Sequence, residues 1–216
     1  MAKKPLLFFI LYVYASFALR AQYHDYGFIQ SNQIHVLTQQ DSILTYAWTG
    51  GMNAMQFGKI DVDLDGTKDL IAFDVHGRRL IPFLNKAKQA HEINYVYAPE
   101  YIPLFPDDIY GFMQLIDFNG DGKEDIFTYK NGGIKVYQNI SDTVLKFNVF
   151  TEQILSIYYE NHINLFCTEG DYIVIKDIDG DGDLDILAFW ALGKYIDYHK
   201  NQSVEKHGNL DYLDYK

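Results

Sequence analysis

The 216-residue sequence lacks most of what redox, nucleic-acid-binding and membrane-spanning functions require. Its one cysteine, Cys167, rules out an internal disulfide and a cysteine-based zinc site. Lysine and arginine number 18 against 29 acidic residues, and the formal charge of −11 argues against a nucleic-acid partner, because phosphates are repelled by an acidic surface. No helical period persists for three turns. With 48% hydrophobic and 16% aromatic residues, the chain still has enough apolar surface to fold around a core.

The first 21 residues have the order of a secretory signal peptide. Two early lysines precede an apolar run from Leu6 to Leu19, and Ala21 offers a small residue for cleavage. The alternative is a transmembrane anchor, but about 14 apolar residues are fewer than the roughly 20 of a spanning helix, and no later segment is apolar enough. We therefore expect residues 1–21 to direct export, residues 22–216 to form the mature chain, and the protein to be secreted or held at the cell surface.

Three acidic stretches share the pattern Asp-x-Asp/Asn-x-Asp-Gly-x-x-Asp, and their starts are separated by 56 and 60 residues. They occupy residues 61–69, 117–125 and 177–185. Each is followed by an apolar run, a turn with glycine, and a second run that ends in asparagine, and such short runs bounded by turn residues are typical of strands and hairpins. The sequence therefore predicts an all-β chain. Its repeats lie roughly at residues 50–85, 111–139 and 171–201.

The connections between the repeats are expected to differ. Residues 86–110 contain three prolines and predict an extended connection, and Pro82 predicts a strand at a sheet edge, because proline cannot donate to the ladder. Residues 142–168 alternate more regularly and are expected to supply outer strands of the next repeat.

The repeated aspartates have the chemistry of a calcium site. Ca²⁺ takes six to eight oxygen ligands, and positions 1, 3, 5 and 9 offer side chains while position 7 offers a carbonyl. Carboxylates packed this closely repel one another unless a divalent cation lies among them. Glycine at position 6 allows the positive φ of a sharp turn. The sequence thus predicts about three structural Ca²⁺ ions, and the ligands are Asp61, Asp63, Asp65, Thr67 and Asp69; Asp117, Asn119, Asp121, Lys123 and Asp125; and Asp177, Asp179, Asp181, Asp183 and Asp185.

Three other interpretations of these loops are less favoured. An EF-hand needs a glutamate at position 12 and flanking helices, whereas position 12 is Ala72, Thr128 or Ala188 and the flanks read as strands. Magnesium prefers to keep several waters in octahedral order. Solvated turns without any ion would explain one such loop better than three at nearly equal spacing.

The three loops, the apolar pairs after them and the secretory start resemble the FG-GAP/VCBS repeat family, over roughly residues 50–201. Members fold as β-propellers with calcium in such loops, so the resemblance implies a partial propeller of about three blades. Phe57-Gly58 precedes the first loop, but no Gly-Ala-Pro follows any loop, which is closer to bacterial secreted VCBS-type variants than to integrin α chains. Because propellers close with four to eight blades, we expect the N-terminal piece of a longer propeller, with further blades outside this chain.

Two functions from different classes fit these features. The first is an exported, calcium-binding, non-catalytic binding or adhesion scaffold whose partner is a protein or glycan outside the cell. The second is a carbohydrate-binding or carbohydrate-active enzyme domain, in which Trp48, Trp190 or the stretch 95–110 stacks on sugar rings, unless these aromatics pack in the core. For catalysis the sequence offers no HExxH pair, no Gly-x-Ser-x-Gly and no signature around Cys167, which is expected to be a buried thiol.

Asn139 and Asn201 begin Asn-x-Ser triplets, which are glycosylation sequons. Each also lies where a repeat's last strand is expected to end. We interpret both as strand-ending asparagines.

Overall fold

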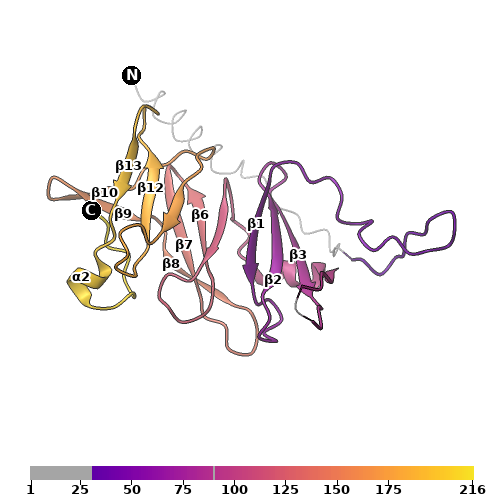
Figure 1. Ribbon diagram of the computed structural model, residues 1–216. Helices are drawn as coiled ribbons and strands as arrows, with labels where there is room; N and C mark the ends of the chain where they lie inside the picture. The colour runs from indigo at the N-terminus through magenta and orange to yellow at the C-terminus, as the bar shows by residue number, and fades with distance from the viewer. Residues whose placement is uncertain (1–30, 90) are drawn as a thin grey trace, which may run out of the picture. The chain divides into compact units, whose positions relative to one another are not determined.

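The computed structural model describes residues 31–89 and 91–216, so the predicted signal peptide, residues 1–21, lies outside the described part. The described residues form small antiparallel sheets, and their helices are short: the 3₁₀ helix η1 (Pro99–Leu104) and α2 (Ser203–His207). The prediction of an all-β chain is confirmed (Figure 1). Among the described residues, no helix has the length and apolar character needed to cross a membrane.

The first sheet is a four-stranded antiparallel meander in the order β1-β2-β3-β4. Its strands are β1 (Met55–Ile60), β2 (Asp69–Asp74), β3 (Arg79–Asn85) and β4 (Tyr95–Tyr97). The prediction that Pro82 marks an edge strand is wrong, because β3 pairs on both sides. Pairing between β3 and β4 stops at Phe83, one residue short of Pro82, and the Pro82 carbonyl accepts a bond from Ala98 N at 3.0 Å. The missing N–H of proline therefore falls where the ladder has already ended.

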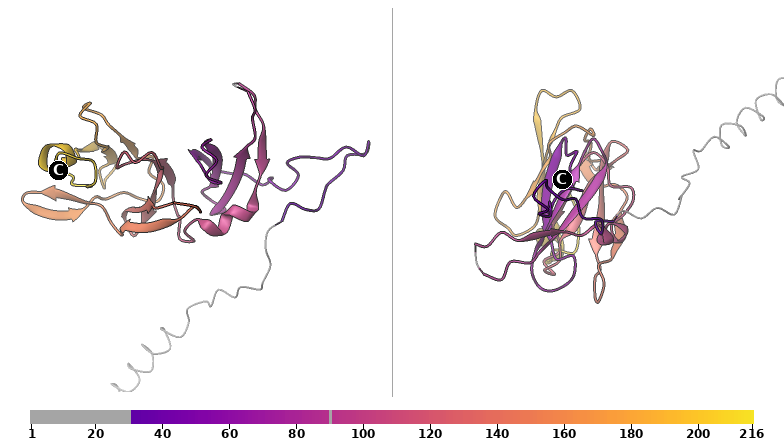
Figure 2. Two further views of the ribbon diagram at one scale, coloured as in Figure 1. Left: turned by 90° about the horizontal axis from the view of Figure 1, so that it is seen from below. Right: turned by 90° about the vertical axis from the view of Figure 1, so that its right-hand side faces the viewer.

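The second sheet repeats this meander in the order β5-β6-β7-β8. Its residues are coloured from pink to orange in Figure 2. Its strands are β5 (Met113–Ile116), β6 (Asp125–Lys130), β7 (Gly133–Asn139) and β8 (Phe147–Thr151). Residues 142–168 were expected to supply outer strands of the next repeat. This prediction is wrong for β8, which pairs with β7. The short turn after β7 returns the chain alongside the strand it has just left, so β8 completes the second sheet.

The third sheet has three strands in the order β11-β12-β13, and a hairpin lies before it in the sequence. The strands are β11 (Val174–Lys176), β12 (Asp185–Phe189) and β13 (Ile196–His199), and the hairpin is β9 (Leu155–Tyr158) with β10 (Asn161–Asn164). Tyr215 connects the two, because it bridges Ser156 of β9 and Asn201 after β13. The Tyr215 ring is fully buried, and its hydroxyl donates to Leu184 O at 2.9 Å.

Two apolar clusters provide most of the core. One joins side chains of the first two sheets, such as Phe73 and Ile126, and the other joins the second and third sheets through Phe127 and Ile186. Burying branched and aromatic side chains of this kind stabilises the fold by about 1.5–3 kcal/mol each. Cys167 lies in the second cluster, fully buried, and burial raises the pKa of its thiol to about 12. It is therefore an unreactive core residue, as expected.

Candidate metal centres

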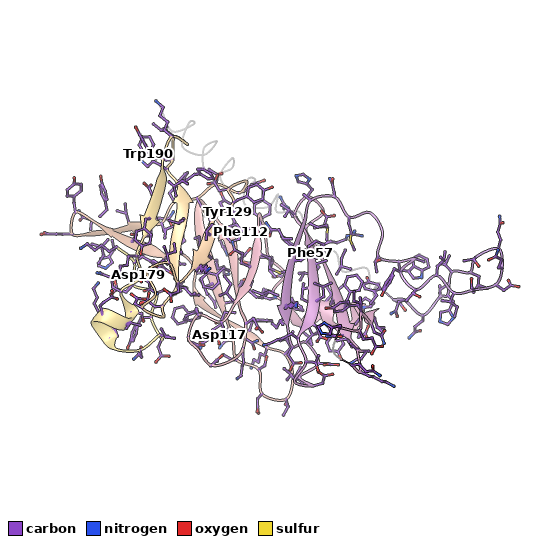
Figure 3. The ribbon with its side chains drawn as sticks, in the orientation of Figure 1. Phe57, Phe112, Asp117, Tyr129, Asp179 and Trp190 are labelled. Atoms are coloured by element: carbon purple, nitrogen blue, oxygen red, sulfur yellow. The ribbon has the colours of Figure 1, made fainter. Side chains whose placement is uncertain are left out.

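Each acidic loop joins the first two strands of its sheet and is closed by its first aspartate. Asp61 accepts hydrogen bonds from Asp65 N at 3.0 Å and from Gly66 N at 2.8 Å. The same carboxylate-to-amide bonds recur in the other loops, between Asp117 and the amides of Gly120, Asp121 and Gly122, and between Asp177 and those of Gly180 and Gly182. Asp117 and Asp179 are labelled in Figure 3. The loops thus hold their shape through side-chain-to-backbone bonds.

Two loop positions, rather than one, adopt the left-handed backbone conformation. The predicted positive φ at position 6 is confirmed at Gly66, Gly122 and Gly182, where φ is 86°, 85° and 102°. Position 4 has positive φ as well, which sequence reasoning missed although two of the three loops have glycine there. In the first loop Leu64 takes this position with φ of 58°, at a cost of roughly 1–2 kcal/mol for a residue with a Cβ.

The last aspartate of each loop is fully buried and ties the loop to the third strand of the same sheet. Asp125 accepts from Phe118 N at 3.0 Å and from Asn139 N at 2.8 Å. Equivalent bonds join Asp69 to Val62 N and Asn85 N, and Asp185 to Ile178 N and Asn201 N. Because both oxygens are used by backbone donors, this aspartate fixes the relative position of loop and strand.

Burial of this aspartate makes its charge costly. Burial is the largest cause that raises the pKa of Asp125, to about 7, the charges of Asp121 and Asp117 add to it, and the two backbone hydrogen bonds oppose it. Burial likewise raises the pKa of Asp69. A cation beside these carboxylates would offset that cost.

The asparagines that end the third strands belong to the same arrangement, and sequence reasoning had not assigned them to the sites. Asn139 is buried; it donates to Glu124 O at 3.1 Å and accepts from Ser141 N at 3.1 Å. Asn201 is buried too and accepts from Ser203 N at 3.2 Å. The interpretation of the two sequons as asparagines that end the last strand of a repeat holds in part: Asn139 ends β7, which is followed by β8 in the same sheet, and Asn201 lies two residues after the end of β13.

The first and third loops bring three carboxylates together, with ligand atoms within 4.8 Å of one another. The groups are Asp61, Asp63 and Asp69, and Asp177, Asp179 and Asp185. Within the described residues the middle loop forms no such group, because its position 3 is the neutral Asn119. The structure therefore gathers positions 1, 3 and 9 of two loops.

A lysine, which sequence reasoning missed, reaches into each of these two loops. Lys86 Nζ lies 2.6 Å from Asp63 Oδ2 and 3.6 Å from Asp65 Oδ2. Lys200 pairs with Asp179 and Asp181. In the part of the chain that the structure describes, Asp117, Asp121 and Asp125 have no ion pair. The signal available in the sequence was a lysine directly beside the strand-ending asparagine.

The donor set fits a hard divalent cation. Every side-chain ligand offered is an oxygen, which suits Ca²⁺ or Mg²⁺, and Asp63 keeps one buried oxygen, Oδ1, that has no hydrogen-bond partner. The carbonyls of Thr67, Lys123 and Asp183 stay predicted ligands. Asp183 also has a buried side chain, whose Oδ2 accepts from Val204 N at 3.0 Å.

Residues 117–188, from the middle loop through most of β12, match the family model of the FG-GAP-like repeat. This segment is similar to the FG-GAP-like repeat. The resemblance inferred from the loop motifs is confirmed there. No curated protein and no solved structure matches the chain.

The first acidic loop lies outside the matched FG-GAP-like segment but has its hydrogen bonds. Asp61 and Asp69 make the loop-closing and strand-fixing bonds that Asp117 and Asp125 make within the segment. The local chemistry of the FG-GAP-like loop therefore occurs three times in the described chain.

A cavity of about 490 Å³ lies between the β9–β10 hairpin and the β12–β13 region. Phe166, Trp190 and Tyr198 contribute aromatic surface to its lining, and Asp197 and His199 contribute polar groups. Figure 3 labels Trp190, which follows β12 and so lies at the end opposite to the third loop. Trp190 and Trp48 are both exposed rather than packed in the core.

Proposed function

We propose that this protein is an exported, non-catalytic binding scaffold built on FG-GAP-like repeats, with Ca²⁺ as a structural ion in its acidic loops. The FG-GAP-like segment supports a binding or scaffold role. Each four-stranded antiparallel meander has the form of a propeller blade, and we propose that the sheets are blades of a propeller that needs more blades to close. The expected partner is a protein or glycan outside the cell.

The observation that carries the calcium proposal is the convergence of Asp61, Asp63 and Asp69 on one point. Their ligand atoms lie within 4.8 Å of one another, and a lysine ammonium already lies against one of them. Such a set is held together only at an electrostatic cost that a divalent cation removes. The third loop repeats the arrangement with Asp177, Asp179 and Asp185.

The expected stabilisation is modest for each ion. Extracellular calcium modules bind at about 10⁻⁴–10⁻³ M. At millimolar calcium, a site with a Kd near 10⁻⁴ M adds about 1.4 kcal/mol to the free energy of unfolding. Ions in several loops would therefore be a substantial part of a typical stability of 5–15 kcal/mol.

Isothermal calcium titration of the chain, with thermal melts in calcium and in EDTA, tests this proposal. We expect saturable binding of up to three ions, a higher Tm in calcium, and a weaker response to magnesium. The variant D61N should lose one binding event, whereas D142N, which changes an exposed aspartate outside the ligand positions, should not. Absence of saturable binding by the folded protein would refute the calcium proposal.

A second candidate is glycan binding at the aromatic cavity. Trp190 and Tyr198 are exposed in its lining, and Asp197 can accept hydrogen bonds from sugar hydroxyls. A screen against an array of glycans, followed by titration of any hit, tests it. W190A should abolish binding, and W48A, which changes an exposed tryptophan outside the cavity, should leave it intact. Binding that survives W190A would place the glycan elsewhere.

A further inference from the structure

A glutamate from outside the third loop lies among that loop's carboxylates. Glu205 belongs to α2, and its ligand atom lies within 4.8 Å of those of Asp179 and Asp181. Lys200 Nζ lies between them, 2.5 Å from Glu205 Oε1 and 3.1 Å from Asp181 Oδ2. Among the described residues, no carboxylate from outside the loop joins the corresponding group of the first loop.

Buried oxygens without a hydrogen-bond donor adjoin the same place. Asp183 is only 1% exposed, and while its Oδ2 accepts from Val204 N, its Oδ1 has no partner. The neighbouring Asp181 Oδ2 is also buried and makes no hydrogen bond, although it lies near Lys200. The Asp183 Oδ1 atom, buried and without a donor, therefore favours a positive charge in addition to the Lys200 ammonium.

We infer that the third loop holds its divalent cation with the help of Glu205, beside the buried Asp183, and that the cation thereby fastens the C-terminal segment to the third sheet. This inference rests on the proposed presence of cations in the loops. The repeated loop pattern assigns no role to the Glu205 carboxylate or to the Asp183 side chain. The inference therefore goes beyond that pattern.

The ammonium of Lys200 occupies the place proposed for the cation and therefore competes with it. This ammonium pairs with Asp179, Asp181 and Glu205. A divalent ion can enter only if that ammonium swings away. Its side chain is about one-third exposed, which leaves it a path to solvent. Removing the ammonium should therefore favour the ion.

The C-terminal segment is attached to the third sheet close to the third acidic loop. The Val204 amide is bonded to Asp183, and the backbones of Lys200 and Lys216 are bonded to each other in both directions. Tyr215 is fully buried and contacts the β9 strand through a bridge to Ser156. A cation between Glu205 and the loop adds another attachment at α2, beside the bond from the Val204 amide to the Asp183 carboxylate.

The test is calcium titration of the full chain and of two variants with opposite expected effects. We expect E205Q to weaken one binding event about tenfold, because the charge of the ligand set tunes calcium affinity. K200Q should strengthen the same event. D211N removes an equal charge from an exposed residue of the same segment and should change nothing. A general loss of folding would weaken binding in both E205Q and K200Q, so the opposite signs separate ligation from structure.

Hydrogen exchange provides a second readout. Calcium should slow amide exchange across residues 203–208 in the unaltered chain, and this effect should vanish in E205Q. If the chain binds calcium but E205Q and K200Q both match it in affinity and exchange, the role of Glu205 is wrong while the proposed function stands. If the chain binds no calcium in any loop, both proposals fail.

Discussion

The middle acidic loop and the two outer ones share a backbone shape but differ in charge. All three are closed by their first aspartate and fixed by their buried last aspartate. The outer loops have aspartate at position 3 and a lysine paired with it, whereas the middle loop has Asn119, and the described residues provide no ion pair to its ligand positions. The shape thus comes from carboxylate-to-amide bonds, and the lysine accompanies the extra carboxylate.

The largest expected effect on stability comes from removing the buried last aspartate, which all three loops share. D125A removes the acceptor for two buried backbone amides and should lower the free energy of unfolding by about 3 kcal/mol, even in EDTA. Urea unfolding measures this. D69A and D185A should behave alike, and D142A should have little effect. A loss below 1 kcal/mol for D125A in EDTA would show that the cation, rather than the amide bonds, fixes the loop.

Giving the middle loop the outer loops' charge tests the difference directly. N119D adds a carboxylate without a partner and should destabilise the metal-free protein by about 1 kcal/mol while tightening calcium binding about tenfold. Adding Q138K places a lysine just before the strand-ending Asn139, as Lys200 precedes Asn201, and should restore the stability in EDTA. Unfolding in EDTA and calcium titration measure both effects. Equal stability of N119D and the unaltered chain in EDTA would remove the proposed reason for the lysines.

Asp108, with Lys130, Lys135 and Tyr137 bonded to it, forms a cluster outside the acidic loops. It is a reference case for lysines that pair with a carboxylate away from the proposed ions. Burial tends to raise the pKa of Asp108, but hydrogen bonds from Tyr137, Lys130 and Lys135 lower it to about 2. The lowered pKa means that ionised Asp108 stabilises the fold above about pH 4, and that this contribution is lost as the pH falls towards 2.

We expect this contribution to be about 1 kcal/mol, since solvent screens the partly exposed carboxylate. The difference in unfolding free energy between the chain and D108N should be constant above pH 5 and shrink below pH 4. It should be the same in calcium and in EDTA, unlike the lysine effects in the outer loops. A difference that depends on calcium would mean that this cluster also responds to the ion.

The smallest expected effect comes from removing the ammonium of Lys86 from the first acidic loop. K86Q should destabilise the metal-free protein by about 0.5 kcal/mol, the usual size for an ion pair that solvent partly screens, and should tighten calcium binding to the first loop. Melting curves in EDTA and calcium titration measure the two changes. K88Q, a change to an exposed lysine two residues away, is the control. Weaker calcium binding by K86Q would show that Lys86 supports the ion rather than replacing it.

Local signals predicted the strands and the turns well. Apolar runs bounded by glycine and asparagine became β2, β6 and β12, and glycine at position 6 has the expected positive φ. Prediction failed where pairing depended on distant segments. Pro82 lies in an inner strand because β4 stops just short of it, and the sheet to which β8 belongs depended on the turn after Asn139.

The sequence by itself determined the all-β class, the three loops and the aspartates at their ligand positions, because these follow from residue type and spacing within nine residues. The tertiary structure alone decided which groups meet the loops from outside: Asn85, Asn139 and Asn201 at the last aspartates, Lys86 and Lys200 at position 3, and Glu205 beside Asp179 and Asp181. These partners are 14 to 26 residues from the residues they contact. Only the pairing of the strands and the docking of α2 bring them close enough for charge and hydrogen bonding to act.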